Sequence, residues 1–384
     1  MTLPPRPEVA GARRVVLKLG TRVLTHDDGA LALGGLVAVV EAAARLVREG
    51  REVLLVSSGA VGLGMNALGL AGATDLAERQ ACAAVGQSRL MQLYSDRFSQ
   101  LGLQCGQVLL TQSDFDDRIR YLNLRSTLEA LLQLSAVPII NENDAVATDE
   151  LAFATGSGVV FGDNDRLSAL VASKLGADLL VLLTDVPGVF DRDPRQHGDA
   201  RLVSHVGTGA LDAQIGGSIS GGGRGGMRSK VEAARIAARA GCHVVIASGR
   251  TPGTLEQVLA GQDAGTWFEA AGGAGLDAKR RWIAFATAPR GVLHLDAGAV
   301  RALVERGASL LAAGVARVEG QFDSGDIVEF RGPDGGVLGR GMVWCDADAA
   351  RRWCAGEPPD GARNHHALVH RNHLALFPDQ GGHP

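Results

Sequence analysis

The first 270 residues of the chain alternate short apolar runs with longer segments of helical periodicity. Six runs have the length and composition of buried strands: Val15–Leu19, Val53–Val56, Gln107–Leu110, Val137–Ile140, Leu179–Leu183 and Val244–Ala247. They alternate with helical segments that include Leu36–Arg48, Glu78–Phe98, Leu122–Leu134 and Lys230–Ala240. This alternation predicts βαβ units, in which helices cover both faces of a mainly parallel sheet. Ligands bind at the carboxyl ends of strands in such sheets, so the residues that follow each strand are the first candidates for a site.

The pattern changes after residue 282. Short alternating runs follow at 282–285, 291–295, 314–319, 327–330 and 339–344, with one helix near 297–306. These runs predict a small β-rich, barrel-like domain. The small residues of Ala270–Gly275 indicate a linker. We therefore predict a first domain over 1–269, a linker over 270–281, a second domain over 282–376 and a tail over 377–384. The chain from about Glu357 onward is expected to fray.

Charge and cysteine content exclude several classes of protein. The formal net charge of −4 gives no overall attraction to nucleic acid or to an anionic membrane. The five scattered cysteines form no C-x-x-C pair, which argues against a zinc site or a disulfide framework and favours a reducing compartment. Met1–Arg14 lacks the apolar core of a signal peptide, and no run of about 18 apolar residues occurs. We expect a cytoplasmic protein with no membrane contact and no metal ligands of its own.

Polar and glycine-rich segments follow several predicted strands. Lys18 lies late in the first strand, and Ser57–Gly64 (SSGAVGLG) follows the second, where backbone N–H groups can surround an anion. Asn141–Asp144 (NEND) follows the fourth strand, and Thr184–Gly188 (TDVPG) follows the fifth. Buried polar groups are costly unless they have partners, so these segments are candidates for binding. The alternatives are a lysine that reaches solvent, ordinary turns and solvated loops.

Two further segments precede predicted helices. The acids of Gly162–Asp165 (GDND) can cap the helix that follows, which is compatible with a catalytic role. The glycine-rich loop at 220–230 matches G-x-G-x-x-G from Gly221, but no strand precedes it, so a dinucleotide fingerprint is not indicated. It is not a P-loop either, because Met227 follows Gly226. A glycine loop that opens a helix, with Lys230 one turn inside, favours a phosphate site over a merely flexible loop.

Taken together, these segments resemble the glutamate 5-kinase family, a branch of the amino acid kinases, in the form with a C-terminal PUA domain. The resemblance covers nearly the whole chain. It rests on the order and spacing of KLGT at 18, SSGAVGLG at 57, AAVGQSRLMQLY at 83, NENDAVAT at 141, GDND at 162, LLTD at 182, GGMRSK at 225, KRRWI at 279 and LLAAGV at 310. It implies a three-layer α/β sandwich with a mainly parallel sheet, followed by a small β-barrel-like PUA domain.

The resemblance also implies ligands and roles. ATP with Mg²⁺ and L-glutamate would be the ligands, L-glutamyl 5-phosphate the product, proline a feedback inhibitor, and the protein a homo-oligomer. Lys18 and Lys230 would flank the transferred phosphoryl group, and Asp165 would orient both lysines. Glutamate-binding positions carried over from the family are Ser58, Asp144 and Asn164. ATP-binding positions are Lys18, Thr184, Asp185, Arg224, Gly225, Gly226, Met227, Arg228, Ser229 and Lys230.

The residue types agree with phosphoryl transfer, which needs positioning and charge neutralisation more than covalent help from the protein. A glutamate side chain with a pKa near 4.3 is already ionised at neutral pH, so no catalytic histidine is expected. The sequence departs from the family at two places. Arg224 and Arg228 replace small hydroxyl residues of the glycine loop. Ala154–Val160 is an insertion between two glutamate-site motifs, which bears on the geometry of proline inhibition.

Two rival interpretations remain. The first is a different amino acid kinase, acting on aspartate, N-acetylglutamate or a nucleoside monophosphate. Only NENDAVAT and the C-terminal module argue against it. The second is an RNA-binding or RNA-modifying protein, because PUA modules elsewhere bind RNA. Residues 282–384 hold 10 arginines, no lysine and 12 acidic residues, a net charge of −2. RNA affinity comes largely from cationic contacts with phosphates, so a regulatory or structural role is favoured over RNA binding.

Overall fold

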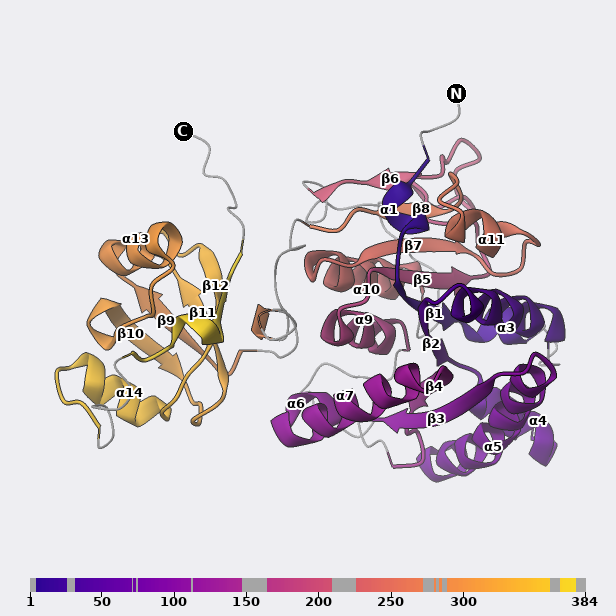
Figure 1. Ribbon diagram of the computed structural model, residues 1–384, viewed down its shortest axis with the longest axis horizontal. Helices are drawn as coiled ribbons and strands as arrows, with labels where there is room; N and C mark the ends of the chain where they lie inside the picture. The colour runs from indigo at the N-terminus through magenta and orange to yellow at the C-terminus, as the bar shows by residue number, and fades with distance from the viewer. Residues whose placement is uncertain are drawn as a thin grey trace. The chain divides into compact units, whose positions relative to one another are not determined.

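The computed structural model describes residues 5–25, 32–70, 72–73, 75–111, 113–146, 164–208, 226–271, 280, 283–284, 289–359 and 367–377. The chain forms two compact units, Met1–Ala271 and Gly272–Pro384. The first is an α/β unit and the second a smaller β-rich unit (Figure 1).

The first unit is built on an eight-stranded sheet in the order β3-β4-β2-β1-β5-β7-β8-β6. Its strands are β1 (Arg14–Leu19), β2 (Glu52–Ser57), β3 (Gln104–Leu110), β4 (Ala136–Glu142), β5 (Leu179–Thr184), β6 (His205–Val206), β7 (His243–Ser248) and β8 (Thr266–Phe268). The six strands from β3 to β7 in this order are mutually parallel, and β8 is antiparallel to β7. All six strands expected from the sequence are present, and the mainly parallel sheet is confirmed.

Helices cover both faces of this sheet (Figure 1). One face carries α1 (Pro7–Ala10), α2 (Thr21–Leu24), α3 (Leu33–Arg48), α4 (Ala60–Leu68), α5 (Leu76–Gln100) and α11 (Thr254–Leu259). The other carries α6 (Ser113–Asp116), α7 (Arg118–Gln133), α9 (Asn164–Leu175) and α10 (Met227–Arg239). Successive strand residues point to opposite faces, so Leu17 packs in one core and Val16 in the other. Burial on both faces explains why the strands are continuously apolar.

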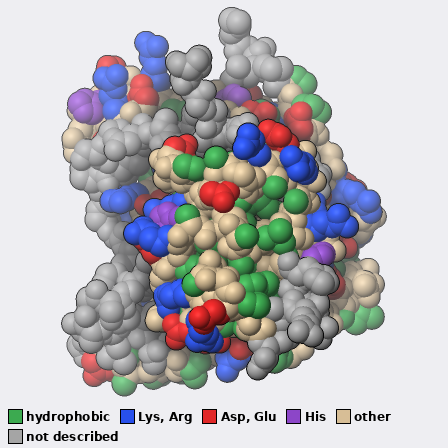
Figure 2. Space-filling view, turned by 90° about the vertical axis from the view of Figure 1, so that its left-hand side faces the viewer, with side chains coloured by type: hydrophobic (Ala, Val, Ile, Leu, Met, Phe, Trp, Pro, Cys, Tyr) green, Lys and Arg blue, Asp and Glu red, His purple; other side chains and the backbone are tan. Residues whose placement is uncertain are grey.

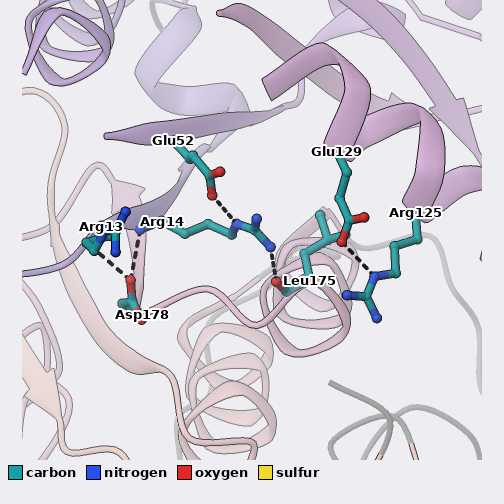
Figure 3. Close-up of polar contacts among 7 residues, drawn as sticks. All are labelled: Arg13, Arg14, Glu52, Arg125, Glu129, Leu175 and Asp178. Carbon is teal, nitrogen blue, oxygen red and sulfur yellow. Dashed lines mark hydrogen bonds and ion pairs between the residues drawn. The ribbon is translucent and has the colours of Figure 1, made fainter. Parts of the chain in front are cut away.

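Polar contacts close the amino-terminal ends of the central strands (Figure 3). The backbone N–H groups of Arg13 and Arg14 both donate to Asp178 Oδ2 at 2.9 Å. The Arg14 guanidinium pairs with Glu52 at 2.6 Å and also donates to the Leu175 carbonyl. These contacts hold β1, β2 and β5 together at one end of the sheet. Ligands in such sheets bind at the opposite end, where the strands have their carboxyl ends.

The second unit contains a five-stranded sheet in the order β10-β9-β11-β12-β13. Its elements are β9 (Gly291–Leu295), α13 (Ala297–Arg306), η2 (Ala312–Gly314), β10 (Val315–Gly320), β11 (Ile327–Arg331), β12 (Val337–Met342), α14 (Ala347–Cys354), η3 (Arg371–His373) and β13 (Leu374–Leu376). Asp296 caps α13 by accepting from the Ala299 N–H at 2.7 Å, so this helix begins where its sequence predicts. The sheet and helices enclose a separate apolar core.

Two expectations for this unit were wrong. Ile283 and Ala284 are helical and buried, whereas the run 282–285 was expected to be a strand. A short apolar run fits a buried helical turn as well as a strand, so periodicity alone could not decide. The chain after Glu357 was expected to fray, yet β13 pairs with β12, and Leu368 is fully buried. Leu368 belongs to the apolar core of this unit, and its burial holds this segment in place.

The face of the molecule drawn in Figure 2 carries basic, acidic and apolar side chains that are interspersed. Among the residues that the structure describes, side chains of one charge do not form a single patch on it. No helix in the described part of the chain combines the length and apolar character needed to cross a membrane.

His243 at the start of β7 accepts two hydrogen bonds at the end of the first unit. Its Nδ1 receives the Trp267 Nε1–H at 3.3 Å and the Ala270 N–H at 3.2 Å. Burial lowers the pKa of His243 below 6.5, although the carboxylates of Glu8, Glu269 and Asp178 act in the opposite direction. The native state therefore favours the neutral ring, which can accept at Nδ1.

We predict that this group makes stability depend on pH below 6.5. Between the lowered native pKa and 6.5, the unfolded state binds more protons, so its contribution is present above 6.5 and is lost as pH falls. His243→Asn keeps an acceptor but does not titrate, so its melting temperature should fall less than that of the native protein from about pH 8 to about pH 5.5. His205→Asn, at a half-exposed histidine, is the control. Equal losses in the native protein and His243→Asn would contradict the prediction.

Candidate active site

A cavity of about 470 Å³ lies in the first unit at the carboxyl ends of β1, β2, β4 and β5. These four strands are adjacent in the sheet, so the segments that follow them converge although they are far apart in sequence. The lining includes the sequence-predicted residues Lys18, Ser58, Asp144, Asn164, Asp165, Thr184, Asp185, Gly226, Met227 and Lys230. The sheet topology thus assembles most of the predicted site.

A buried ion-pair cluster lies in this cavity. Lys18 Nζ is 2.6 Å from Asp165 Oδ1, and Lys230 Nζ is 2.9 Å from Asp165 Oδ2. Asp165 is completely buried, and the two lysine side chains are less than a tenth exposed. Lys18 comes from β1, Asp165 from the first turn of α9 and Lys230 from the first turn of α10. One carboxylate therefore fixes two ammonium groups that come from distant parts of the chain.

The charge state of Asp165 follows from its surroundings. Burial acts to raise its pKa, but the ammonium groups of Lys18 and Lys230 outweigh burial and hold the pKa below the usual value. Ser229 Oγ also donates to Asp165 Oδ2 at 2.9 Å. At neutral pH the group is an acceptor-only carboxylate, which can orient both lysines but cannot donate a proton.

Ser58, Asp144 and Asn164 line the same cavity, as the sequence predicts for an acceptor site. Ser58 precedes Gly59, the N-cap residue of α4, which has a φ of 97°. This left-handed conformation strains residues other than glycine, and it turns the chain sharply out of β2. Asn164 Oδ1 is buried with no hydrogen-bond partner among the described residues. An acceptor in this state suits a ligand that brings an N–H donor.

Two segments were expected to bind a nucleotide, and the first of them, Thr184 and Asp185, lines the cavity. Thr184 donates to Asp185 Oδ1 at 3.0 Å, and Arg22 pairs with Asp185 Oδ2 at 3.0 Å. Burial acts to raise the pKa of Asp185, but these hydrogen bonds and the Arg22 charge lower it overall.

Within the glycine loop, Gly226 and Met227 line the cavity. Arg228 is exposed and pairs with Glu232 at 3.1 Å, so its side chain is not among the lining groups. Arg224, Gly225 and the insertion Ala154–Val160 lie outside the described residues.

Several lining residues had no individual role in the sequence analysis, among them Arg22, Arg79, Arg192, Arg195 and Asn141, the last of which lay in a candidate segment. Arg22 follows the KLGT motif by one residue, and Asn141 opens the NEND segment, so both were visible but had no assigned role. Arg192 and Arg195 belong to a charged loop well after β5, where strand-end reasoning gives no signal. Their cations add positive charge around the cavity.

The donor set bears on whether the protein holds a metal by itself. In the described ranges, no three His, Cys, Asp or Glu side chains converge as a metal site. Asp165 is already engaged by two lysines. The arrangement fits a hard cation that arrives with phosphate oxygens and keeps much of its water, which is how Mg²⁺ usually binds in kinases.

Comparison with known proteins gives two family matches. Residues 13–248 match the model of the amino acid kinase family, and residues 291–357 match the PUA domain. A glutamate 5-kinase from Picosynechococcus is 49% identical over 334 residues, covering 86% of this chain and 87% of the relative. One from Bradyrhizobium diazoefficiens is 43% identical and covers 96% and 99%, and one from Rhodopseudomonas palustris is 44% identical and covers 97% and 98%.

Proposed function

The chain belongs to the glutamate 5-kinases of the amino acid kinase family, and we propose that the Lys18–Asp165–Lys230 cluster is its catalytic centre. The reaction transfers the γ-phosphoryl group of ATP to the side-chain carboxylate of L-glutamate and gives L-glutamyl 5-phosphate, the first step of proline biosynthesis. The observation that carries the proposal is the pair of ammonium groups held on one buried carboxylate in the cavity.

The two lysines supply positive charge where the reaction needs it. Lys18 and Lys230 flank the transferred group and stabilise the negative charge on its oxygens in the transition state. Asp165 acts through them, because it fixes both ammonium groups before substrate binds and so reduces reorganisation. No residue has to remove a proton from the acceptor, since a glutamate carboxylate is ionised at neutral pH.

Ser58, Asp144 and Asn164 bind the α-amino and α-carboxylate groups of glutamate in this proposal. Asp144 supplies the negative charge that pairs with the ammonium, and Asn164 Oδ1 offers a second acceptor for its N–H groups. With both ends held, the acceptor oxygen is placed in line with the phosphoryl group.

ATP takes the side of the cavity lined by Thr184, Asp185, Gly226 and Met227, with Lys18 and Lys230 at the phosphate end. Arg224, Gly225, Arg228 and Ser229 stay predictions as ATP contacts, and Ser229 also holds Asp165. Mg²⁺ would enter with the nucleotide and neutralise charge on its phosphate oxygens. The N-terminal end of α10 directs its partial positive charge toward the same region.

The proposal also covers regulation and assembly. Proline shares the α-amino and α-carboxylate groups of glutamate, so one pocket can hold either compound. We propose competitive inhibition by proline and a homo-oligomeric protein. The cytoplasmic location, the domain limits at 269 and 282, and a regulatory or structural role for the PUA domain without RNA contact stay predictions.

ADP release in the presence of ATP and Mg²⁺ tests the proposed function. The acceptor panel is L-glutamate, L-aspartate, N-acetylglutamate and UMP, with an arm that adds proline to the glutamate reaction. We expect activity with L-glutamate, and inhibition by proline that is relieved by more glutamate. A purified, folded protein that acts on another acceptor of the panel and not on glutamate would overturn the assignment.

A further inference from the structure

Gln87 on α5 makes a buried contact behind the acceptor side of the cavity. Asn141, near the end of β4, donates through Nδ2 to Gln87 Oε1 at 2.8 Å. Asn141 is 1% exposed and Gln87 is 8% exposed. Asn141 lines the cavity but Gln87 does not. Gln87 therefore touches a residue of the cavity wall from behind.

The directions of these hydrogen bonds are determined by the backbone. The N–H of Glu142 donates to Asn141 Oδ1 at 2.9 Å, and a backbone N–H can only donate. The Asn141 atom that faces Gln87 is therefore Nδ2, which donates, so Gln87 must accept through Oε1. This leaves Gln87 Nε2, which is buried with no hydrogen-bond partner among the described residues. Such an N–H costs about 1–3 kcal/mol, so this position keeps an amide at a cost to stability.

Close packing of α5 against α4 fixes the backbone next to Gln87. At the neighbouring Gly86, a Cβ atom would lie 1.7 Å from the Ala60 carbonyl oxygen. At Gly64, it would lie 1.8 Å from the Cys82 carbonyl oxygen. The backbones of α4 and α5 thus approach as closely as glycine allows. Because α4 begins directly after Ser58 and Gly59, Gln87 is fixed relative to that side of the cavity.

We propose that Gln87 is a positioning residue for the acceptor substrate. By accepting from Asn141, it links the helix pair behind Ser58 to the strand end that leads to Asp144, and it keeps these two walls of the cavity at a fixed separation. The inference depends on the proposed function, in which the two walls hold the same glutamate molecule. If this separation changed, the two walls would no longer both contact one glutamate molecule in a preorganised site, so acceptor binding would weaken and KM for glutamate would rise.

The test uses Gln87→Met, which keeps length and apolar bulk but removes the acceptor. We expect KM for glutamate to rise about tenfold while KM for ATP stays within about twofold, because only the acceptor walls are affected. The melting temperature should change little, since one unpaired buried donor on Gln87 is replaced by another on Asn141. Gln92→Met, the same substitution at an exposed position of α5, is the matched control.

A double-mutant cycle shows whether Gln87 acts through Asn141. In an Asn141→Ala background, Gln87→Met should change KM for glutamate by less than about twofold, because the contact is already absent. Additive effects in the cycle would overturn the proposal, as would an unchanged KM in Gln87→Met. If Gln87→Met does not fold, Gln87→Leu, which also removes the acceptor for Asn141, takes its place, and the same rise in KM for glutamate is expected. Native protein that does not phosphorylate glutamate would instead reject the proposed function.

Discussion

Lys18→Ala and Lys230→Ala are each expected to reduce kcat by roughly 10²-fold or more in a protein that remains folded, because each ammonium stabilises charge that develops in the transition state. Their geometry supports this: the two cations are fixed on opposite oxygens of one carboxylate, at 2.6 and 2.9 Å, inside the cavity. KM for glutamate should change much less than kcat, since the acceptor is held by other groups.

Stability has to be separated from catalysis in this experiment. Removing one partner of a buried ion pair typically costs about 3–5 kcal/mol, although here Asp165 keeps a second lysine in either variant. Thermal unfolding of each variant, with and without ATP, reports whether the fold survives. Arg239→Ala removes an exposed cation from the last turn of α10 and is the matched control, expected to leave kcat unchanged. A folded Lys18→Ala or Lys230→Ala with near-native kcat would show that the lysine is not part of the catalytic centre.

Much of the fold could be predicted because the strands are buried on both faces. A run such as Leu179–Leu183 is apolar at every position, as expected for a central strand between two helical layers, and its alternation with longer helical segments supported that interpretation. The second unit was harder to predict, because its elements are short. The helix α14 was missed although Asp346 caps it by accepting from the Ala349 N–H at 2.8 Å. The helical turn at Ile283 was predicted as a strand because a run of four apolar residues is too short to show a periodicity.

For the candidate site, the sequence could predict which segments meet but not which side chains contact one another. Residues that follow strands were found because topology alone brings strand ends together, as with Ser58 and Asp144. Contacts between side chains could not be found in this way. The pairing of Arg22 with Asp185 depends on which rotamers meet across the cavity, and the outward position of Arg228 depends on Glu232 one turn later. Gln87 was quoted within a motif, but its role depends on the orientation of a distant amide.

Asp144→Asn is expected to raise KM for glutamate by roughly 10- to 100-fold and to leave KM for ATP nearly unchanged. A hydrogen bond to a charged group contributes about 1.5–3 kcal/mol, and 1.4 kcal/mol corresponds to a factor of ten. The asparagine keeps the shape of the side chain, so the loss reports the charge that pairs with the substrate ammonium. Asp185→Asn is the reciprocal control: because Asp185 lies on the proposed nucleotide side, it should raise KM for ATP and spare that for glutamate.

Acceptor analogues extend the same argument. L-Aspartate is shorter by one methylene, which in a hydrophobic pocket gives only about 1–3 kcal/mol of discrimination. In this site both ends of the acceptor are fixed by polar groups, so shortening the chain pulls the carboxylate about 1 Å or more out of line and adds a penalty on the order of 10²-fold. N-Acetylglutamate should fail for another reason, because acetylation removes the ammonium that Asp144 pairs with. Its residual activity should therefore be insensitive to Asp144→Asn, whereas glutamate loses most of its advantage in that variant. If Asp144→Asn left KM for glutamate unaltered, the ammonium would have to be held elsewhere, and the acceptor site would be assigned to the wrong wall of the cavity.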